Sequence, residues 1–399
     1  MKKLICFAVT SSTLLLMNGC SAAGTSTDPN TTDSNETVVS QDQNLTENNE
    51  TTTTQTQAKD QDFTDKNETT GTQTQGNPAL RVVSTPNPSL FPLLIAMSEN
   101  PTLNASLVPV SGSSTINSAF QNGKGDALLS MTFVAAKKSN DASIEAMHLH
   151  SVNFWSGFHT LTHQEDNISS MDDLVGKNYM ISGPVGTGEN GGPDIFFQAA
   201  MRAVGKSATN FTMYYQSLNE GYQTFGNKTV MDDGEKVSGY HMVEPAASGI
   251  IMNGMMGSYS AVRSVDMQAL INDVEGYTAW SNNELPLGGF SIAARVDNNS
   301  SYDATVSSVL TAYNNAAQAL MAAKGSLRKL QQYGSVISNG IARYYGDYNV
   351  SIPVPVIVAA IRNGKLVYKD NVPMESIKSE LDTFLEFVIE DEVAEEFYR

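Results

Sequence analysis

Short apolar runs alternate with amphipathic segments along residues 80–131. The pattern predicts strands at 80–83, 107–110 and 127–131, and helices at 90–97 and 113–120, with a turn at 122–126 before the third strand. Buried strands that alternate with helical segments are typical of parallel βαβ units. The first part of the folded chain is therefore expected to form an open α/β sheet.

The same pattern restarts after residue 172. A strand at 178–182 leads into a Gly-rich loop at 183–192, and a helix then begins at Pro193 and stops at Gly205. Proline in the first turn and glycine just past the end are the expected boundary signals of a helix. Further strands are predicted at 213–216, 239–243, 288–296 and 353–355, and helices at 304–323, 327–333 and from 374 to the end.

This order predicts an α/β fold of two βα lobes with a ligand cleft between them and a helical C-terminal part. Lobe 1 is expected to comprise residues 78–168 plus 289–399, and lobe 2 residues 169–288. Closure over a ligand would use hinges near 169–177 and 283–288.

The first 19 residues have the pattern of a secretory signal peptide. Lys2 and Lys3 precede an apolar run from residue 4 to 17, which is too short for a membrane-spanning helix of about 20 residues. The segment Leu16-Met-Asn-Gly-Cys20 resembles a bacterial lipobox, in which the cysteine is acylated, with palmitate for example, and becomes the mature N-terminus. The alternative is an ordinary signal peptide with a chance cysteine. We expect an exported protein that is lipid-anchored in the periplasm or on the outer face of the cytoplasmic membrane.

Residues 20–77 are predicted to be an acylated cysteine followed by a disordered polar tether. Thr, Asn, Gln, Ser, Asp and Glu dominate this segment, and Phe63 is its only aromatic residue. Too little apolar surface is available there to offset the entropy of ordering the chain. The formal charge of −18 divides into +2 in the signal, −8 in the tether and −12 beyond it. Self-repulsion is expected to extend the tether.

One motif recurs along the tether and beyond it. An acid stands two residues before an asparagine, and Ser or Thr two residues after it, at Asn35, Asn44, Asn49, Asn67, Asn167, Asn299 and Asn349. Composition predicts roughly one such frame in a chain of this size. The frame resembles the acceptor sequence of a bacterial N-glycosylation system that requires the acid. In the tether, the bias toward these residue types is the alternative explanation.

Composition restricts the chemistry of the folded part. Its acidity and the lack of a basic stripe argue against nucleic acid as a partner. The two cysteines, Cys6 and Cys20, lie in or at the end of the signal, so we expect no disulfide, no thiolate nucleophile and no thiolate metal site. No cofactor and no metal are predicted, and the protein is expected to be a monomer that is not an enzyme.

Three short segments have a recognisable pattern. They are Asn122-Gly-Lys-Gly-Asp-Ala127, Met171-Asp-Asp-Leu-Val-Gly-Lys177 with the strand and Gly-rich loop at 181–188, and Tyr240-His-Met-Val-Glu-Pro-Ala246. In this order and spacing they resemble the type II periplasmic solute-binding proteins of the nitrate, sulfonate, taurine and thiamine-precursor group. The resemblance covers most of residues 80–340 and implies a bilobal receptor for an ABC importer. Beyond Arg343 the chain departs from the family, which leaves the class of ligand open.

Candidate ligand residues lie where predicted strands end and helices begin. In open α/β sheets ligands bind at this edge, and helix N-termini favour anions. The candidates are Ser84, Thr85, Ser113, Ser114, Thr115, Ser130, Thr132, Gly186, Thr187 and Gly188, joined by His241 and Glu244 near the end of the strand at 239–243. Hydroxyls and free N–H groups favour a sulfonate, carboxylate or phosphonate. The alternative for each hydroxyl is an ordinary helix cap.

Two further groups of residues have a structural interpretation beside a functional one. His159 and His163 have the i, i+4 spacing of a metal pair on a helix, but their neighbours look like a buried crossover strand. For these two and for His148 and His150, which lie just before them, a conformational or partly buried role is expected. Clustered methionines (Met252, Met255, Met256) and aromatic residues (Tyr214, Tyr215, Trp280) more often pack a core than line a pocket.

The sequence therefore predicts a lipid-anchored receptor that captures a small, anionic solute and delivers it to an ABC permease. Alternatives are a ligand-sensing lipoprotein for a membrane kinase or chemoreceptor, and an enzyme of pyrimidine-precursor type on the same fold. The enzyme lacks support because the Cys-rich motif expected for it is missing from the folded part.

Overall fold

The computed structural model describes residues 78–183, 188–227, 235–256, 259–274, 280–369 and 372–399. All of them belong to one compact unit, Gly71–Arg399. Cys20, the tether and the acceptor frames at Asn35, Asn44, Asn49 and Asn67 lie outside the described residues. Among the described helices, none combines the length and apolarity that a bilayer crossing requires.

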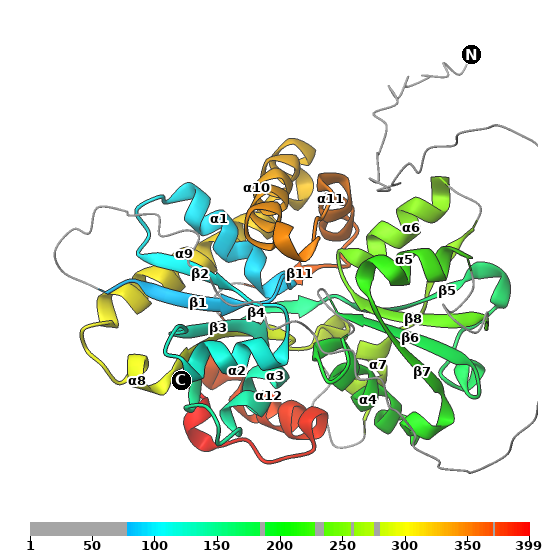
Figure 1. The fold of residues 1–399 in the computed structure, drawn as a ribbon, viewed down its shortest axis with the longest axis horizontal. Coiled ribbons are helices and arrows are strands. Elements are labelled where there is room, and N and C mark those ends of the chain that lie inside the picture. The colour runs from blue at the N-terminus through cyan, green and yellow to red at the C-terminus, as the bar shows by residue number, and fades with distance from the viewer. Residues whose placement is uncertain (1–77, 184–187, 228–234, 257–258, 275–279, 370–371) are drawn as a thin grey trace, which may run out of the picture. The chain divides into compact units, whose positions relative to one another are not determined.

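The first sheet has six strands in the order β11-β4-β10-β3-β1-β2 (Figure 1). Strand β1 pairs in parallel with β2 and β3, whereas β10 is antiparallel to both β3 and β4. The strands are β1 (Leu80–Ser84), β2 (Ala105–Pro109), β3 (Ala127–Met131), β4 (Met147–Ser156), β10 (Gly288–Ala293) and β11 (Val367–Tyr368).

The second sheet has five strands in the order β7-β6-β8-β5-β9. Strand β6 is parallel to β7 and β8, and β5 is antiparallel to β8 and β9. The strands are β5 (Phe158–His163), β6 (Asn178–Gly183), β7 (Thr212–Ser217), β8 (Val237–Val243) and β9 (Ala261–Val265).

Both sheets follow one plan. In each sheet, three neighbouring strands are parallel, and the next strand across the sheet is antiparallel to them. This antiparallel strand is β10 in the first sheet and β5 in the second, and in both cases the preceding strand along the chain belongs to the other sheet. The chain crosses between sheets at Gly157, between β4 and β5, and returns before β10. The pairing thus places β5 in the second sheet, earlier than the lobe boundary predicted at 168/169, and the division into lobes stays a prediction.

Helices cover both sheets (Figure 1). Against the first sheet lie α2 (Ser113–Gln121), α3 (Thr132–Ser139), α8 (Ala294–Asp297) and α9 (Asp303–Ala322), and α1 (Phe91–Glu99) packs against α9. Against the second lie α4 (Gly192–Ala203), α5 (Leu218–Asn227), α6 (Ala246–Met256) and α7 (Met267–Asn272). The C-terminal helices are α10 (Leu327–Tyr345), α11 (Val354–Arg362) and α12 (Met374–Ile389), of which α11 contacts α6 and α12 contacts both α3 and α4.

The prediction of a strand at 353–355 is wrong, because α11 begins there. Pro353 is the N-cap residue and Pro355 lies in the first turn, where a missing N–H costs the helix nothing. The β-branched residues that follow, such as Val356 and Ile357, are buried on this helix, which packs against α10. Tertiary packing outweighs intrinsic β-propensity here. The returning strand is also shorter than predicted and ends at Ala293.

One apolar core runs through the first sheet and continues onto one face of the second. Phe133 of α3 lies 6.3 Å from Phe158 of β5 and 6.0 Å from Phe196 of α4, measured between ring centroids. A smaller cluster, with Phe225 and Tyr240, fills the other face of the second sheet, beneath α5 and α6. The two sheets are therefore joined by buried aromatic contacts as well as by the chain itself.

Candidate ligand-binding site

The loop after β1 is held by internal hydrogen bonds. The Ser84 hydroxyl is fully buried and donates to the carbonyl oxygen of Leu129 at 2.9 Å. Asn87 donates to the same carbonyl at 3.1 Å and to the Thr85 hydroxyl at 3.2 Å. The Tyr345 hydroxyl donates to the Ser84 carbonyl oxygen at 2.6 Å. The loop is thus positioned by α10, and Thr85 keeps a partly exposed side chain.

The three hydroxyls at the start of α2 have different roles. Thr115 accepts from the backbone N–H of Gly112 at 3.0 Å and of Ser111 at 3.1 Å, so its hydroxyl caps the helix, as the alternative interpretation had it. Ser113 and Ser114 are exposed. These two side chains remain accessible at a helix N-terminus, which is the arrangement that favours an anion.

The hydroxyls at the end of β3 form hydrogen bonds to backbone carbonyl oxygens within the protein. Thr132 is fully buried and donates to the Pro286 carbonyl oxygen at 2.6 Å, which ties the start of α3 to the segment returning to β10. Ser130 is buried and donates to the Met131 carbonyl oxygen at 3.0 Å.

The start of α4 meets the end of β3. A Cβ atom added to Gly192 would lie 3.2 Å from the Met131 Cγ atom, so strand-end segments of the two sheets are in contact here. Gly188 has φ +78°, and a Cβ on it would lie 2.3 Å from the Gly183 nitrogen, so glycine is required at this position. Gly186 and Thr187 lie outside the described residues.

A buried carboxylate already stands in the first turn of α4. Asp194 accepts from the Asn190 N–H at 2.8 Å, from Gln198 at 2.9 Å and from the Tyr215 hydroxyl at 3.0 Å. Burial and the negative charge of Asp194 raise the pKa of Tyr215. This helix N-terminus is thus partly neutralised from within the protein.

Glu244, at the end of β8, is fully buried in a polar cluster. Its carboxylate pairs with Arg263 and accepts from the Ser248 N–H at 3.1 Å. Burial raises the pKa of Glu244, and the Arg263 charge opposes the shift. The His159 Nε2 atom lies 3.5 Å from the carboxylate, and burial holds the pKa of His159 well below its usual range. The peptide bond between Glu244 and Pro245 is cis.

His241 is an aromatic-core residue in the structure. It has no exposed surface, its ring stacks at 5.6 Å on Phe158, and its Nδ1 atom lies 3.4 Å from the Thr160 hydroxyl. Its Nε2 atom has no hydrogen-bond partner among the described residues. Burial lowers the pKa of His241 to about 3, so the ring is neutral at physiological pH.

The other histidines also lie on strands, which confirms the crossover-strand interpretation over the helical one. His163 is buried and stacks on Phe225 at 4.2 Å. His148 and His150 on β4 both reach Asp297, at 2.5 and 2.8 Å. Within the described ranges no group of His, Cys, Asp and Glu has the arrangement of a metal site.

Sequence reasoning missed Gln268 of α7, which contacts both connections between the sheets. Its Oε1 atom accepts from the N–H groups of Gly157 at 3.0 Å and Phe158 at 3.3 Å. Its Nε2 atom donates to the carbonyl oxygens of Trp155 at 3.3 Å and Asn283 at 2.7 Å. A lone glutamine carries no motif, so only the tertiary structure identifies it. The side chain lies in the predicted hinge region near 283–288.

The methionines and aromatic residues divide between surface and core. Met255 and Met256 are among the most exposed large apolar residues described, at 80% and 72%. Tyr214 packs against the cluster beneath α5 and α6, and Trp280 packs edge-on against Trp155 at 5.4 Å.

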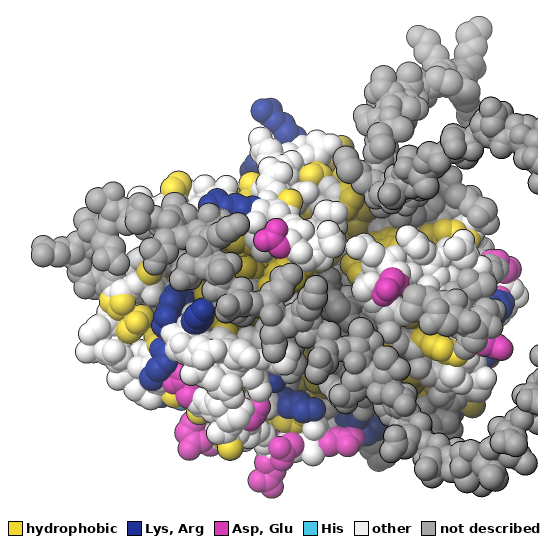
Figure 2. Space-filling model, in the orientation of Figure 1, with side chains coloured by type: hydrophobic (Ala, Val, Ile, Leu, Met, Phe, Trp, Pro, Cys, Tyr) yellow, Lys and Arg dark blue, Asp and Glu magenta, His cyan; other side chains and the backbone are white. Residues whose placement is uncertain are grey.

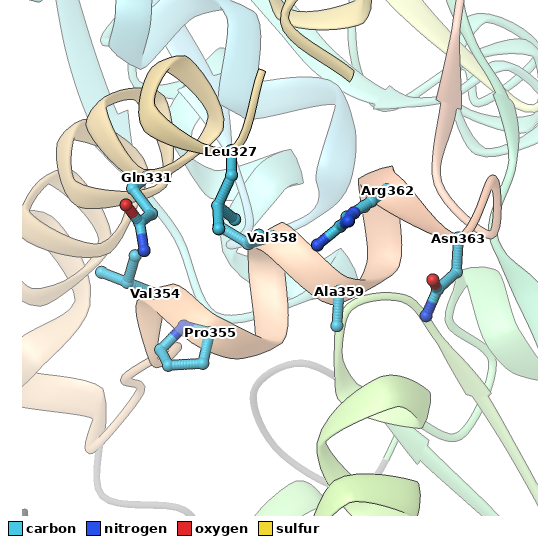
Figure 3. Close-up of a pocket in the computed structure, with 8 residues that line it drawn as sticks. All are labelled: Leu327, Gln331, Val354, Pro355, Val358, Ala359, Arg362 and Asn363. Carbon is cyan, nitrogen blue, oxygen red and sulfur yellow. The ribbon is translucent and has the colours of Figure 1, made fainter. Parts of the chain in front are cut away.

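A pocket of about 380 Å³ lies between α10 and α11, away from the loops just described (Figure 3). Leu327, Val354 and Val358 form an apolar wall, and Gln331 and Arg362 supply polar atoms. None of the sequence-predicted ligand residues lines it. On the viewed face, Figure 2 shows the Lys and Arg side chains in separate small groups between neutral and acidic ones.

Comparison with solved structures identifies the architecture. The structure superimposes with a TM-score of 0.53 on the ligand-binding component of an ABC-type import system from Staphylococcus aureus with zinc bound, covering 81% of this chain and 96% of that one at 10% identity. The chain has the periplasmic binding protein fold.

Two further structures with this fold agree. The periplasmic aliphatic sulphonate-binding protein from Escherichia coli matches with a TM-score of 0.52 and 16% identity, over 79% of this chain and 95% of that one. The periplasmic nitrate-binding protein from Synechocystis PCC 6803 matches with a TM-score of 0.53 and 13% identity, over 79% and 81%. No protein-family model and no curated protein matches the sequence. The resemblance to solute-binding proteins is thereby confirmed for the periplasmic binding protein fold.

Proposed function

We propose that the protein is an extracytoplasmic solute-binding receptor of an ABC importer, anchored through an acyl group on Cys20. The observation that carries the proposal is the shared plan of the two sheets, which brings the start of α4 against the end of β3. Ligands of open α/β sheets bind at such strand ends. The similar structures are binding proteins, and two of them are described as sulphonate- and nitrate-binding.

The proposed ligand is a small anion, such as a sulfonate or carboxylate, enclosed by cleft closure. Ser113 and Ser114 at the start of α2 are the described side chains that support this choice best, because they are exposed at a helix N-terminus. Thr187 and Gly186 are proposed contacts outside the described residues. Ser84, Thr115, Ser130 and Thr132 support the loops in this proposal, and their bonds to backbone atoms hold the site in shape.

The experiment is native mass spectrometry of the freshly purified protein, followed by thermal-shift titration with nitrate, a short alkanesulfonate and a short carboxylate. A copurified small molecule, or a rise in Tm with one of these anions, supports the receptor. No copurified molecule and no stabilisation by any of the three would contradict it.

Paired variants locate the site. The double variant Ser113→Ala/Ser114→Ala should bind the anion about tenfold or more weakly than the wild type, since two hydrogen bonds to a charged group are lost. Ser335→Ala on α10 is the matched control, because its hydroxyl donates to the Gln331 carbonyl oxygen within the helix. Equal affinity in the wild type, the double variant and Ser335→Ala would refute the proposed anion site.

A ligand-sensing lipoprotein for a membrane kinase or chemoreceptor uses the same closed form, and it is the second candidate. Rescue of solute uptake in a deletion strain distinguishes the two, because a sensor alters gene expression or movement and leaves uptake rates unchanged.

A further inference from the structure

Three acceptor frames of the type acid-x-Asn-x-Ser/Thr fall within the described residues, and all three asparagines are exposed in turns. Asn167 follows the 3-10 helix Gln164–Asp166 with φ +51°, and Asn349 follows the 3-10 helix Gly346–Tyr348 with φ +56°. Asn299 lies just after α8. The frames thus occupy accessible surface connections of the fold, where a modifying enzyme can reach the chain.

The three frames differ in the state of the acid. Glu165 and Asp347, which precede Asn167 and Asn349, are exposed. In the frame of Asn299 the acid is Asp297, and its side chain is only 10% exposed.

Three cationic or polar partners enclose the Asp297 carboxylate. Its Oδ2 atom lies 2.5 Å from the His148 Nδ1 atom and 3.2 Å from the Arg399 Nε atom, and its Oδ1 atom lies 2.8 Å from the His150 Nε2 atom. An enzyme that selects the frame by its carboxylate must contact that group, and here the contact would require the cluster to open. The Oδ2 atom is hydrogen-bonded to His148, and the whole side chain is nearly buried.

The asparagine side chains do not distinguish the frames. The Asn299 Oδ1 atom accepts from the Ser301 N–H at 3.1 Å, and the Asn167 Nδ2 atom donates to the Glu165 carbonyl oxygen at 3.1 Å. Each is a single bond of an exposed asparagine that water can replace, so the difference between the frames lies in the exposure of the acid.

We propose that Asn167 and Asn349 are covalent saccharide-attachment sites, and that Asn299 stays unmodified although it has the same sequence frame. The donor is a saccharide joined through its anomeric carbon to a lipid pyrophosphate. The Asn amide nitrogen forms a bond to that carbon while the bond from carbon to pyrophosphate oxygen breaks. The lipid pyrophosphate leaves with the electron pair, and one amide proton is lost to base. An exposed carboxylate two residues earlier gives the transferase a charge to pair with.

The chain carries its own controls. Asn210 is exposed and is followed by Thr212, but Ala208 stands where the frame needs an acid. The conservative variants Glu165→Gln and Asp347→Asn remove the acid and leave asparagine and serine in place. Both changes are on exposed side chains, so the fold should persist.

The experiment is glycopeptide mass spectrometry of the full-length protein isolated from membranes of the organism that encodes it. We expect saccharide on the peptides with Asn167 and Asn349, and unmodified peptides for Asn299 and Asn210. Each of Glu165→Gln and Asp347→Asn should lower occupancy at its own site at least tenfold, as Asn167→Gln and Asn349→Gln abolish it.

Two results would overturn the proposal. One is bare Asn167 and Asn349, whether or not the tether asparagines are modified. The other is Asn299 occupied to the same extent as those two, which would show that the enclosed carboxylate of Asp297 does not matter. Both readouts are independent of any ligand and of the proposed import function.

Discussion

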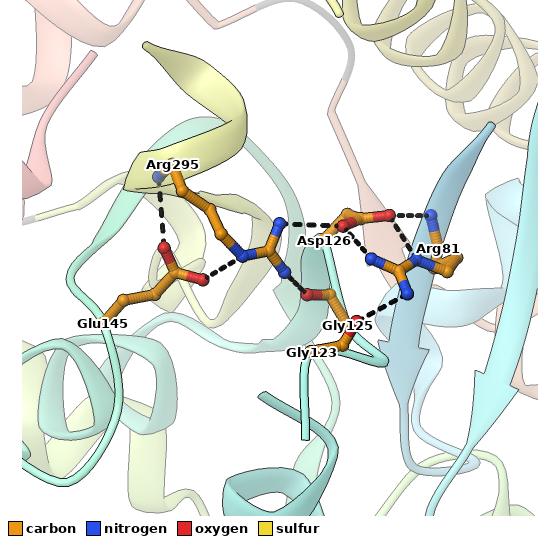
Figure 4. A network of polar contacts seen from close by, with 6 residues as sticks. All are labelled: Arg81, Gly123, Gly125, Asp126, Glu145 and Arg295. Carbon is orange, nitrogen blue, oxygen red and sulfur yellow. Dashed lines mark hydrogen bonds and ion pairs between the residues drawn. The ribbon is translucent and has the colours of Figure 1, made fainter. Parts of the chain in front are cut away.

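Replacing Asp126 by alanine should destabilise the fold more than any single surface change in the same network (Figure 4). The Asp126 side chain is fully buried just before β3 and accepts three hydrogen bonds from Arg81, at 2.7 to 2.9 Å, and one from Arg295 at 3.0 Å. Burial alone would raise the pKa of Asp126, but the hydrogen bonds from the two arginines outweigh it and lower the pKa. The carboxylate therefore contributes stability as an ion.

The magnitude follows from what the substitution leaves behind. Removing one partner of a buried ion pair costs about 3–5 kcal/mol. The Arg81 and Arg295 side chains are 40% and 39% exposed and can be hydrated in the variant, so we expect the lower end, about 3 kcal/mol. Glu145→Ala is the control, because it removes a more exposed partner of Arg295, and it should cost less than about 1 kcal/mol.

The assay is urea unfolding followed by the fluorescence of Trp155 and Trp280 and, in parallel, by circular dichroism. Since the pKa of Asp126 is lowered in the folded state, its contribution is complete above the unfolded pKa near 4 and is lost as the pH falls below it. The difference between wild type and Asp126→Ala should thus be constant from pH 7 to 5 and shrink below pH 4. A cost equal to that of Glu145→Ala, or one independent of pH down to 3, would refute the reasoning.

Three further changes test the core and the crossover. Gly221→Ala should lower stability by about 1–3 kcal/mol in urea unfolding, because the added Cβ would overlap the Tyr240 hydroxyl, whereas Gly346→Ala meets open space and should be neutral. In the wild type, His241 takes up a proton below about pH 6.5 in the unfolded state but stays neutral in the folded state. Its titration should therefore lower the free energy of unfolding by about 2 kcal/mol between pH 7 and pH 5. His241→Phe should remove that part of the pH dependence. If the free energy of unfolding in urea depends on pH equally in His241→Phe and in the wild type, the buried neutral ring is contradicted. Gln268→Ala should speed hydrogen exchange of the Gly157 peptide about tenfold, and unaltered exchange would show that the crossover does not depend on this side chain.

Much of the architecture could be predicted because local sequence signals mark where many strands and helices begin and end. The strands at 80–83, 127–131 and 178–182 and the helix that begins near Pro193 each combine an apolar run with a turn or capping signal, and the structure has all of them. The strand prediction at 353–355 is wrong because a short apolar segment, here Pro-Val-Pro, suits either a strand or the first turn of a buried helix. The contact with α10 favours the helix over the strand, and this contact cannot be predicted from the neighbouring residues in the sequence.

The site was harder to predict because a hydroxyl at a strand end has two competing uses. Thr115 binds backbone N–H groups, whereas Ser113, two residues earlier, remains exposed. Both follow the same glycine and have the same local signals. What separates them is their position in the helical turn, where one side chain points back to the N-cap and the other does not. Gln268 shows the converse case, in which a side chain that hydrogen-bonds both connections between the sheets has no local sequence signal.

The structure also narrows where an anion could bind. The sequence predicts ligand contacts at the starts of both α2 and α4, but the first turn of α4 holds the buried carboxylate of Asp194, whose charge opposes a second anion nearby. The exposed N-terminus of α2, with Ser113 and Ser114, carries no such carboxylate in its first turn. If the ligand is an anion, its charged group should therefore lie nearer α2 than α4, and its uncharged part should face the second sheet. Asp194→Asn should then leave affinity for a short alkanesulfonate within about threefold, or raise it, while Ser113→Ala lowers it. A loss of affinity in Asp194→Asn equal to that in Ser113→Ala would place the charged group at α4 instead.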